Sequence, residues 1–356
     1  MKTEWTSKTS RRLSSLDGIR AISIILVILG HLGGTRGFGN GNRLDLGIGD
    51  YAHLGVVVFF VISGFLITSL LLSEHRKNGA VSLKLFYARR SIRIFPAAYA
   101  YLAVVALLWW WGSLQLKAGD FWHAVTYTVN FQPDSSWQVA HLWSLSVEEQ
   151  FYLLWPLAFV VLGPRHAVWA AAAFILLSPI ARSVNRLFLI GTPYHDLPMF
   201  PMVADSLATG CLLARLRGWL ENQGWYLRLF QPVYSFLLLV LLLLINRFMG
   251  YTVVSVVGVS IVNFILAILI HRSVYQPGDR LGQLLNWKPV IFVGTLSYSL
   301  YLWQQLFINR EAHDWINTFP QNLALTVFTA LSSYLLLEKP LLHLRHRLQA
   351  GPAQKE

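Results

Sequence analysis

The feature that most constrains this chain is a series of apolar segments, each long enough to cross a lipid bilayer as a helix. A membrane-spanning helix needs about 20 predominantly apolar residues, and hydropathy separates about ten such segments here. The sequence therefore predicts an all-α polytopic membrane protein whose transmembrane helices form a single bundle. The predicted spans are 16–34, 51–72, 95–112, 146–163, 167–182, 199–214, 230–246, 252–270, 290–308 and 320–338.

Composition supports a membrane protein. The 356 residues are 55% apolar and only 13% charged, whereas soluble domains carry about 25% charged residues. The net charge of +12 fits basic residues held at one membrane face better than a nucleic-acid partner, which we do not expect. A single cysteine, Cys211, excludes an internal disulfide and a multi-cysteine metal site, and no metal is predicted. We expect Cys211 to be a small buried hydrophobe, and no cleavable signal peptide is expected.

The distribution of Lys and Arg predicts the orientation. An even number of spans puts both termini on one side, and most basic residues then lie in the pieces on that side. By the positive-inside rule this side is the cytoplasm, which predicts N-in and C-in topology. The external pieces hold only Arg36, Arg43, Lys117, Arg182, Arg186, Arg247 and Arg310.

No separate soluble domain is predicted. The longest loops, about 35–50, 113–145 and 183–198, are too short to fold alone. Residues 1–345 are expected to form one transmembrane domain, and residues 346–356 a short cytoplasmic tail. Chemistry must then be performed by the bundle and its loops.

A first polar cluster lies in the apolar run Ser15–Gly34. Arg20 and His31 are eleven residues apart, which places them on one helical face and about 16 Å apart along the axis. Ionisable groups inside a membrane usually face a bundle interior or a wet cavity, so this stripe is a candidate pathway. Gly30 and Gly34 leave room for a neighbouring backbone around His31. Alternatively, Arg20 extends to the headgroups and His31 is a satisfied polar group between helices.

A second cluster lies in Tyr87–Pro96, where Arg89, Arg90 and Arg93 share one helical face. Pro96 is suited to opening the third span. A basic cluster is ordinarily a topology signal at the cytoplasmic face. Three guanidinium groups on one face also match phosphate oxygens, so the cluster is a candidate phosphate clamp.

Two further clusters lie closer to the C-terminus. In the first, Ser146 and Glu149 have the spacing of a capping box, which assigns Glu149 to the helix start. Glu148 then points about 100° away and is available, close to His141, to orient or charge a histidine. In the second, three polar side chains are spaced three apart along one face, and the two tyrosines among them are interpreted as anchors at the membrane interface. The three side chains are Tyr298, Tyr301 and Gln304.

Together these segments resemble the acyltransferase-3 family of bacterial membrane acyltransferases, over essentially the whole chain. The similarity comes from several blocks in one order rather than from a single motif. The blocks are LDGIRAISIILVILGH (Leu16–His31), GVVVFFVISGFLI (Gly55–Ile67), YARRSIRIFPAAY (Tyr87–Tyr99), HLWSLSVEEQFYLLWPL (His141–Leu157), SYSLYLWQQ (Ser297–Gln305) and LLLEKPLLHLR (Leu335–Arg345).

The resemblance implies residue roles. Arg20 and His31 match the family's Arg-x10-His motif and Arg90 and Arg93 its Arg-x-x-Arg motif, while its acidic block holds Glu148 and Glu149. The expected site therefore has His31, Glu148 and Glu149 as catalytic residues and Arg20, Arg89, Arg90 and Arg93 as donor-binding residues. Gln304 stands where the family often has His, and Val57 where it often has Asp. The soluble hydrolase-like domain of some relatives is not expected here.

The resemblance also implies a reaction. Family members move an acyl group, usually acetyl, from cytoplasmic acyl-CoA to a hydroxyl of an extracytoplasmic glycan or another acceptor, in the bacterial inner membrane. Neutral His31 would take the proton of the attacking hydroxyl. A transporter or flippase that uses the Arg20 and His31 stripe is the rival from another class. Acylation of a non-glycan acceptor is the rival within enzymes.

Overall fold

The computed structural model describes residues 14–38, 50–195, 197–248, 254–312 and 314–342. All regular elements within these residues are helices, which confirms the predicted fold class. Six helical stretches are long and apolar enough to cross a membrane. They are α2 (Ser14–Leu32), α3 (Tyr51–Asn78), α4 (Leu83–Trp110), Trp137–Phe188, Val254–Tyr275 and Gln321–Leu342.

Three more helices lie on predicted spans: two of them, with 21 and 20 residues, are long enough but are not among the six, and the third is apolar but has only 16 residues. They are α8 (Phe200–Leu220), α10 (Pro232–Arg247) and α13 (Lys288–Phe307). The remaining elements are α5 (Asp120–Val125), α6 (Trp137–Ala140), α7 (Leu142–Phe188), α9 (Gly224–Arg228), α11 (Val259–Tyr275), α12 (Arg280–Leu285) and α14 (Gln321–Ser333), the 3-10 turns η1 (Val129–Phe131) and η3 (Trp315–Asn317), and the π-helical turns η2 (Val254–Gly258) and η4 (Tyr334–Glu338).

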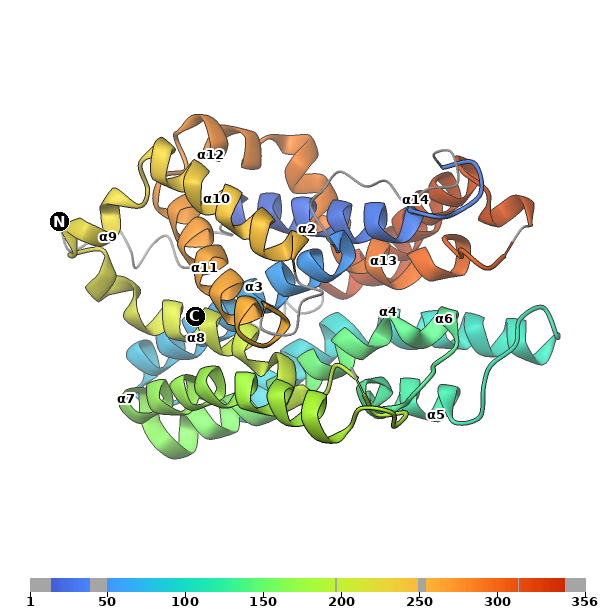
Figure 1. The fold of residues 1–356 in the computed structure, drawn as a ribbon, viewed down its shortest axis with the longest axis horizontal. Coiled ribbons are helices and arrows are strands. Elements are labelled where there is room, and N and C mark those ends of the chain that lie inside the picture. Colours follow the sequence, from blue (N-terminus) through green and yellow to red (C-terminus); the bar gives the residue numbers. More distant parts are fainter. Residues whose placement is uncertain (1–13, 39–49, 196, 249–253, 313, 343–356) are drawn as a thin grey trace, which may run out of the picture.

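Helix α7 consists of two helices that meet at Gly163, where the backbone is not helical, and it covers two predicted spans. Gly163 has φ 73° and ψ 163°, a conformation that a residue without Cβ adopts at little cost. The halves 142–162 and 164–188 therefore match the predicted spans 146–163 and 167–182. Figure 1 shows them lying one against the other in the lower half of the view.

Helix α2 packs between α3 and α13, and Figure 1 shows it beside α13 along much of its length. Glycine permits both close approaches. A Cβ on Gly294 of α13 would lie 1.8 Å from the carbonyl oxygen of Asp17, and one on Gly30 of α2 would lie 2.6 Å from the backbone nitrogen of Ala52. The predicted role of Gly30 is confirmed. The same prediction for Gly34 is wrong, because Gly34 follows the end of α2 with φ 93° and meets only the side chain of Arg310.

The third predicted span starts too late. Helix α4 begins at Leu83, where the Ser82 side chain accepts a hydrogen bond from the Leu85 backbone nitrogen at 3.4 Å. Pro96 lies inside this helix rather than at its start, so that prediction is wrong. The consequence is that the arginine cluster belongs to the helix itself and stands two to three turns from its first residue.

The predicted capping box is also wrong. Helix α7 begins at Leu142, and the Ser146 hydroxyl donates to the Leu142 carbonyl at 2.9 Å from within the helix. A serine that bonds to the carbonyl four residues earlier cannot cap the helix start. Glu149 is therefore not held at a helix terminus.

Two further predictions concern single residues. Arg182 was expected in an external loop, but it lies in α7 and forms an ion pair with the fully buried Asp205. Cys211 is buried, as predicted. The predicted tail 346–356 and Arg43 lie outside the described residues, and the extent of the transmembrane domain stays a prediction.

Candidate active site

A cavity of about 1710 Å³ opens inside the bundle. Its walls come from α2, α3, α4, α7, α8, α13 and the turn η4. It runs along α3 from Asn78, the last residue of that helix, to Val56, a span of about 33 Å. Its cationic lining residues are Arg20, Arg76, Lys77, Arg89, Arg90, Arg93, Arg215 and Arg217.

All four predicted donor-binding residues line this cavity. Arg89, Arg90 and Arg93 reach it from α4, and Arg20 reaches it from α2. Opposite charges stand close to several of them. Glu338 interacts electrostatically with Arg93 and Arg20, and Arg20 lies 3.7 Å from an Asp17 carboxylate oxygen. The cavity is thus a channel of positive charge that carboxylates partly balance.

Arg90 differs from its neighbours because two carboxylates already hold it. One of its terminal nitrogens lies 3.4 Å from both Glu148 and Glu149, and its guanidinium carbon lies 3.0 Å from the centre of the Tyr152 ring. A guanidinium engaged in this way is neutralised and stacked on an aromatic face. Arg90 therefore orients the two glutamates.

Glu148 is the centre of a small polar network in the cavity wall. Its carboxylate accepts a hydrogen bond from Ser63 at 2.5 Å and another from the Tyr152 hydroxyl. Sequence reasoning assigned no role to Ser63 or Tyr152. The signal for Tyr152 was its position four residues after Glu148, which puts both on one helical face. Ser63 lies in the apolar block Gly55–Ile67, where nothing local marked its partner.

His31 lies at the end of α2 and is not among the cavity-lining residues. Its Nδ1 is 3.0 Å from the side-chain oxygen of Gln304, and its ring meets the edge of Trp137 at 5.9 Å between centroids. Arg310 donates to the backbone carbonyls of His31, at 3.3 Å, and of Gly30. With this amide orientation Nδ1 carries the proton, which leaves the Nε2 lone pair available as a base.

Glu148 and Glu149 do not reach His31, although the sequence suggested that they orient a histidine. The acidic group that interacts electrostatically with His31 is Asp50, the residue that caps α3. Ala52, which packs on Gly30, and Val56, the last cavity residue on α3, are one helical turn apart, about 6 Å. The structure therefore holds the carboxylates in the cavity wall and His31 about one turn beyond its closed end.

A buried polar layer fills the space at that end. The Tyr301 hydroxyl donates to the His141 carbonyl at 2.6 Å and lies 2.6 Å from the Ser144 hydroxyl. Gln304 is fully buried, and its amide nitrogen has no hydrogen-bond partner among the described residues. The interpretation of Tyr298 and Tyr301 as interfacial anchors is wrong, because both line the cavity and donate hydrogen bonds to backbone carbonyls of neighbouring segments. Gln304 contacts His31.

Comparison with protein families matches this chain to the acyltransferase-3 profile, described as an acyltransferase domain, over residues 13–338. The chain belongs to the acyltransferase-3 family. In this family member the Arg-x10-His motif has one residue in the cavity, Arg20, and one beyond it, His31.

Two curated relatives carry names that describe an activity. The chain is 29% identical to the peptidoglycan O-acetyltransferase OatA of Listeria monocytogenes over 84% of its own length and 50% of that protein's. It is 28% identical to the O-acetyltransferase OatA of Staphylococcus aureus over 93% of its length and 57% of that protein's. The chain thus spans about half the length of the curated relatives it matches. No solved structure gives a significant match.

The described residues contain no group of three or more His, Cys, Asp or Glu side chains that could hold a metal ion. The prediction that the reaction needs no metal stays a prediction.

Proposed function

We propose that this protein is a membrane O-acyltransferase that moves an acyl group from acyl-CoA to a hydroxyl of a carbohydrate acceptor. The acyl group that we propose is acetyl. The observation that carries the proposal is the long cavity lined by arginines, with a carboxylate network in its wall and a histidine just beyond its closed end. Membership of an acyltransferase family and the names of the relatives support acyl transfer.

The donor fits the cavity by charge and by shape. Coenzyme A is a phosphorylated nucleotide with a long, narrow arm that ends in the thioester. Arginine forks bind phosphate oxygens, and Arg89 and Arg93 stand two to three turns from the start of α4. Among the described residues no carboxylate forms an ion pair with Arg89. The arm then extends toward Tyr301 and Ser144 at the closed end.

His31 acts as the general base in this proposal. The acceptor hydroxyl oxygen attacks the thioester carbonyl carbon, and its proton passes to Nε2 of His31. The carbon–sulfur bond breaks, and the CoA thiolate takes the proton from His31 as it leaves. His31 lies about one helical turn beyond the end of the cavity. For the thioester to reach it, the buried layer at Tyr301 and Gln304 must therefore open. The carboxylates Glu148 and Glu149, held by Arg90, shape the wall along which the arm passes.

We further propose ten spans with both termini in the cytoplasm, in the bacterial inner membrane. A reporter that is active only in the cytoplasm should give signal when fused after the C-terminal tail and none when inserted in the loop 113–145. Protease accessibility of the same fusions provides a second measurement. The reverse pattern would place the cavity mouth away from cytoplasmic acyl-CoA and reject the proposed donor.

Turnover tests the function directly. Purified protein in nanodiscs, supplied with acetyl-CoA and peptidoglycan fragments, should release CoA thiol and produce acetylated glycan. A protein that transports such fragments without releasing CoA would instead be a transporter or flippase. A preparation that acetylates only a non-glycan hydroxyl would retain the enzyme class and reject the acceptor.

Arg93→Lys should raise the KM for acetyl-CoA about tenfold, because lysine keeps the charge but loses the bidentate fork. The matched control is Arg280→Lys in α12, which lies at the same end of the bundle outside the cavity. Both variants should insert normally, as judged by yield and gel filtration. An unchanged KM in Arg93→Lys would mean that Arg93 does not bind the donor and contributes only to the orientation of the protein in the membrane.

A further inference from the structure

The cavity has a second group of basic residues at its mouth, apart from the arginines of α4 and α2. Arg76 and Lys77 lie in the last turn of α3, and Arg215 and Arg217 lie in the last turns of α8. All four line the cavity. The mouth is therefore basic on two walls that come from different helices.

Two of these side chains, Arg76 and Arg217, lie close enough to interact in spite of their like charge. Arg76 and Arg217 repel each other electrostatically, and Arg217 stacks over Phe65 with its carbon 5.9 Å from the ring centre. Two carboxylates line the same part of the cavity: Glu221 lies 3.4 Å from Arg217, and Glu74 accepts a hydrogen bond from the Ser82 backbone nitrogen at 2.9 Å. Among the described residues no carboxylate forms an ion pair with Arg76 or Arg215. The mouth thus keeps a positive charge that an anion would balance.

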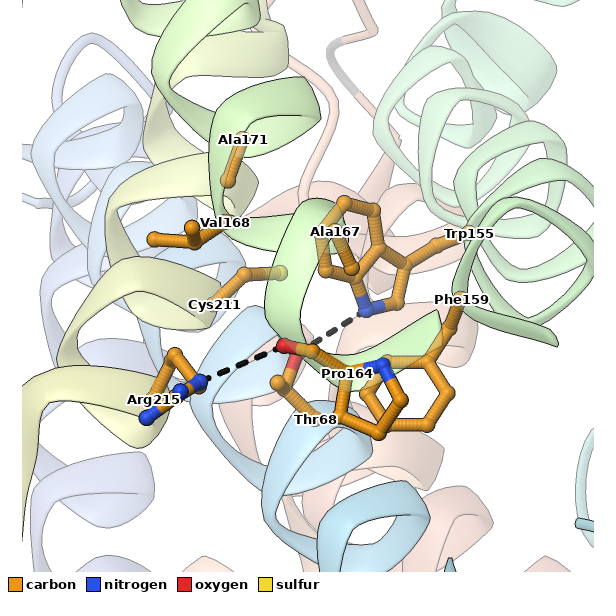
Figure 2. A pocket seen from close by; sticks show the side chains of 9 residues that line it. All are labelled: Thr68, Trp155, Phe159, Pro164, Ala167, Val168, Ala171, Cys211 and Arg215. Atoms are coloured by element: carbon orange, nitrogen blue, oxygen red, sulfur yellow. Dashed lines mark hydrogen bonds between the residues drawn. The ribbon is translucent and has the colours of Figure 1, made fainter. Parts of the chain in front are cut away.

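The Arg215 side chain is exposed and is anchored at one of its nitrogens. Its Nε donates to the carbonyl of Pro164 at 3.2 Å, just after the break in α7 (Figure 2). The space behind it, among Thr68, Trp155 and Cys211, has a volume of about 10 Å³, which suffices for one water molecule at most. A larger ligand therefore reaches this guanidinium from the large cavity that Arg215 also lines, or from its exposed side, and not from this small space.

The spacing of the two basic groups can be measured along the helices. Only Gly79–Ser82 separates α3 from α4, so the last turn of α3 and the first turn of α4 lie at the same end of the bundle. Arg89 is six residues from the start of α4, about 9 Å deeper, and Arg93 is about 15 Å deeper. A ligand that spans both groups needs two anionic centres, one at the mouth and one further inside.

We propose that Arg76, Lys77, Arg215 and Arg217 form a second anion subsite that binds the 3′-phosphate on the ribose of the acyl-CoA donor. The inference rests on the proposed function, and it assigns the diphosphate to Arg89 and Arg93. Coenzyme A enters with the thioester leading and keeps its phosphoadenosine end at the mouth. The alternative is that the four residues only complement the C-terminal ends of α3 and α8 and set topology.

Binding of two ligands separates these interpretations. CoA and 3′-dephospho-CoA differ only in the 3′-phosphate, and both can be titrated by calorimetry against the full-length protein in nanodiscs. The native protein should bind CoA about 10- to 100-fold more tightly, as expected for charge-assisted hydrogen bonds. In the double variant Arg76→Ala with Arg215→Ala, CoA affinity should fall to that of dephospho-CoA, whose own affinity should not change.

Arg228→Ala is the control, because Arg228 is exposed in α9 at the same end of the bundle and does not line the cavity. It should keep the full preference for CoA. Equal binding of both ligands by the native protein would overturn the subsite while leaving acyl-CoA as donor. A double variant that weakens both ligands equally would also overturn it. Binding of neither ligand to the native protein would reject the proposed donor itself, and the subsite with it.

Discussion

His31→Ala is expected to lower the rate of acetyl transfer about 10²- to 10⁴-fold, the usual loss when a general base is removed. The variant should still bind acetyl-CoA, because His31 does not line the cavity that holds the basic residues. It should also fold, since Arg310 holds the end of α2 through backbone carbonyls and not through the ring. Single-turnover kinetics and CoA titration on one nanodisc preparation measure both quantities.

His31→Gln distinguishes a base from a polar support. Glutamine can hydrogen-bond to Gln304 in place of the imidazole, but it accepts no proton at neutral pH. It should therefore be nearly as inactive as alanine. Turnover close to the native rate would mean that His31 is structural, and the base would then have to be sought at His141 or Glu148.

Asp205→Ala is expected to lower the free energy of unfolding by about 3–5 kcal/mol, because it leaves a buried guanidinium without its counter-charge. Arg182 lies 2.9 Å from the Asp205 carboxylate and 2.8 Å from the Ser260 hydroxyl, and its Nε donates to the Val256 carbonyl at 2.9 Å. It also donates to the Met202 carbonyl at 2.5 Å. One side chain thus joins α7, α8, η2 and α11.

The double variant Arg182→Met with Asp205→Leu is the matched control, because it removes both charges and keeps the volume filled. Such replacements of a buried pair are often neutral or stabilising, so most of the lost stability should return. Thermal unfolding in detergent measures all three proteins. A double variant as unstable as the single one would show that packing around Asp205, and not its charge, holds these helices together.

The sequence alone determined the helical membrane fold and singled out four of the arginines that line the cavity. An apolar segment in lipid must satisfy its backbone hydrogen bonds internally, so its length and hydropathy are enough to predict a helix. Arg93 had to share a face with Arg89 and with Arg90, because helical geometry brings together residues four and three positions apart. The close approach of a neighbouring backbone to Gly30 followed from the missing side chain, although only the structure shows that this backbone is that of Ala52.

Local spacing could not decide which partner each polar group would choose. The Ser146 and Glu149 pattern fits a helix start, yet Glu149 instead pairs with Arg90, 59 residues earlier. His31 pairs with Gln304, 273 residues away, and not with the acidic block. A buried charge or imidazole pairs with the complementary group that tertiary packing places within hydrogen-bond distance. The free-energy cost of leaving it unpaired in a low dielectric exceeds the gain from a local hydrogen bond. Only the tertiary structure brings those groups together, and only it separates the cavity from His31 by a closed layer.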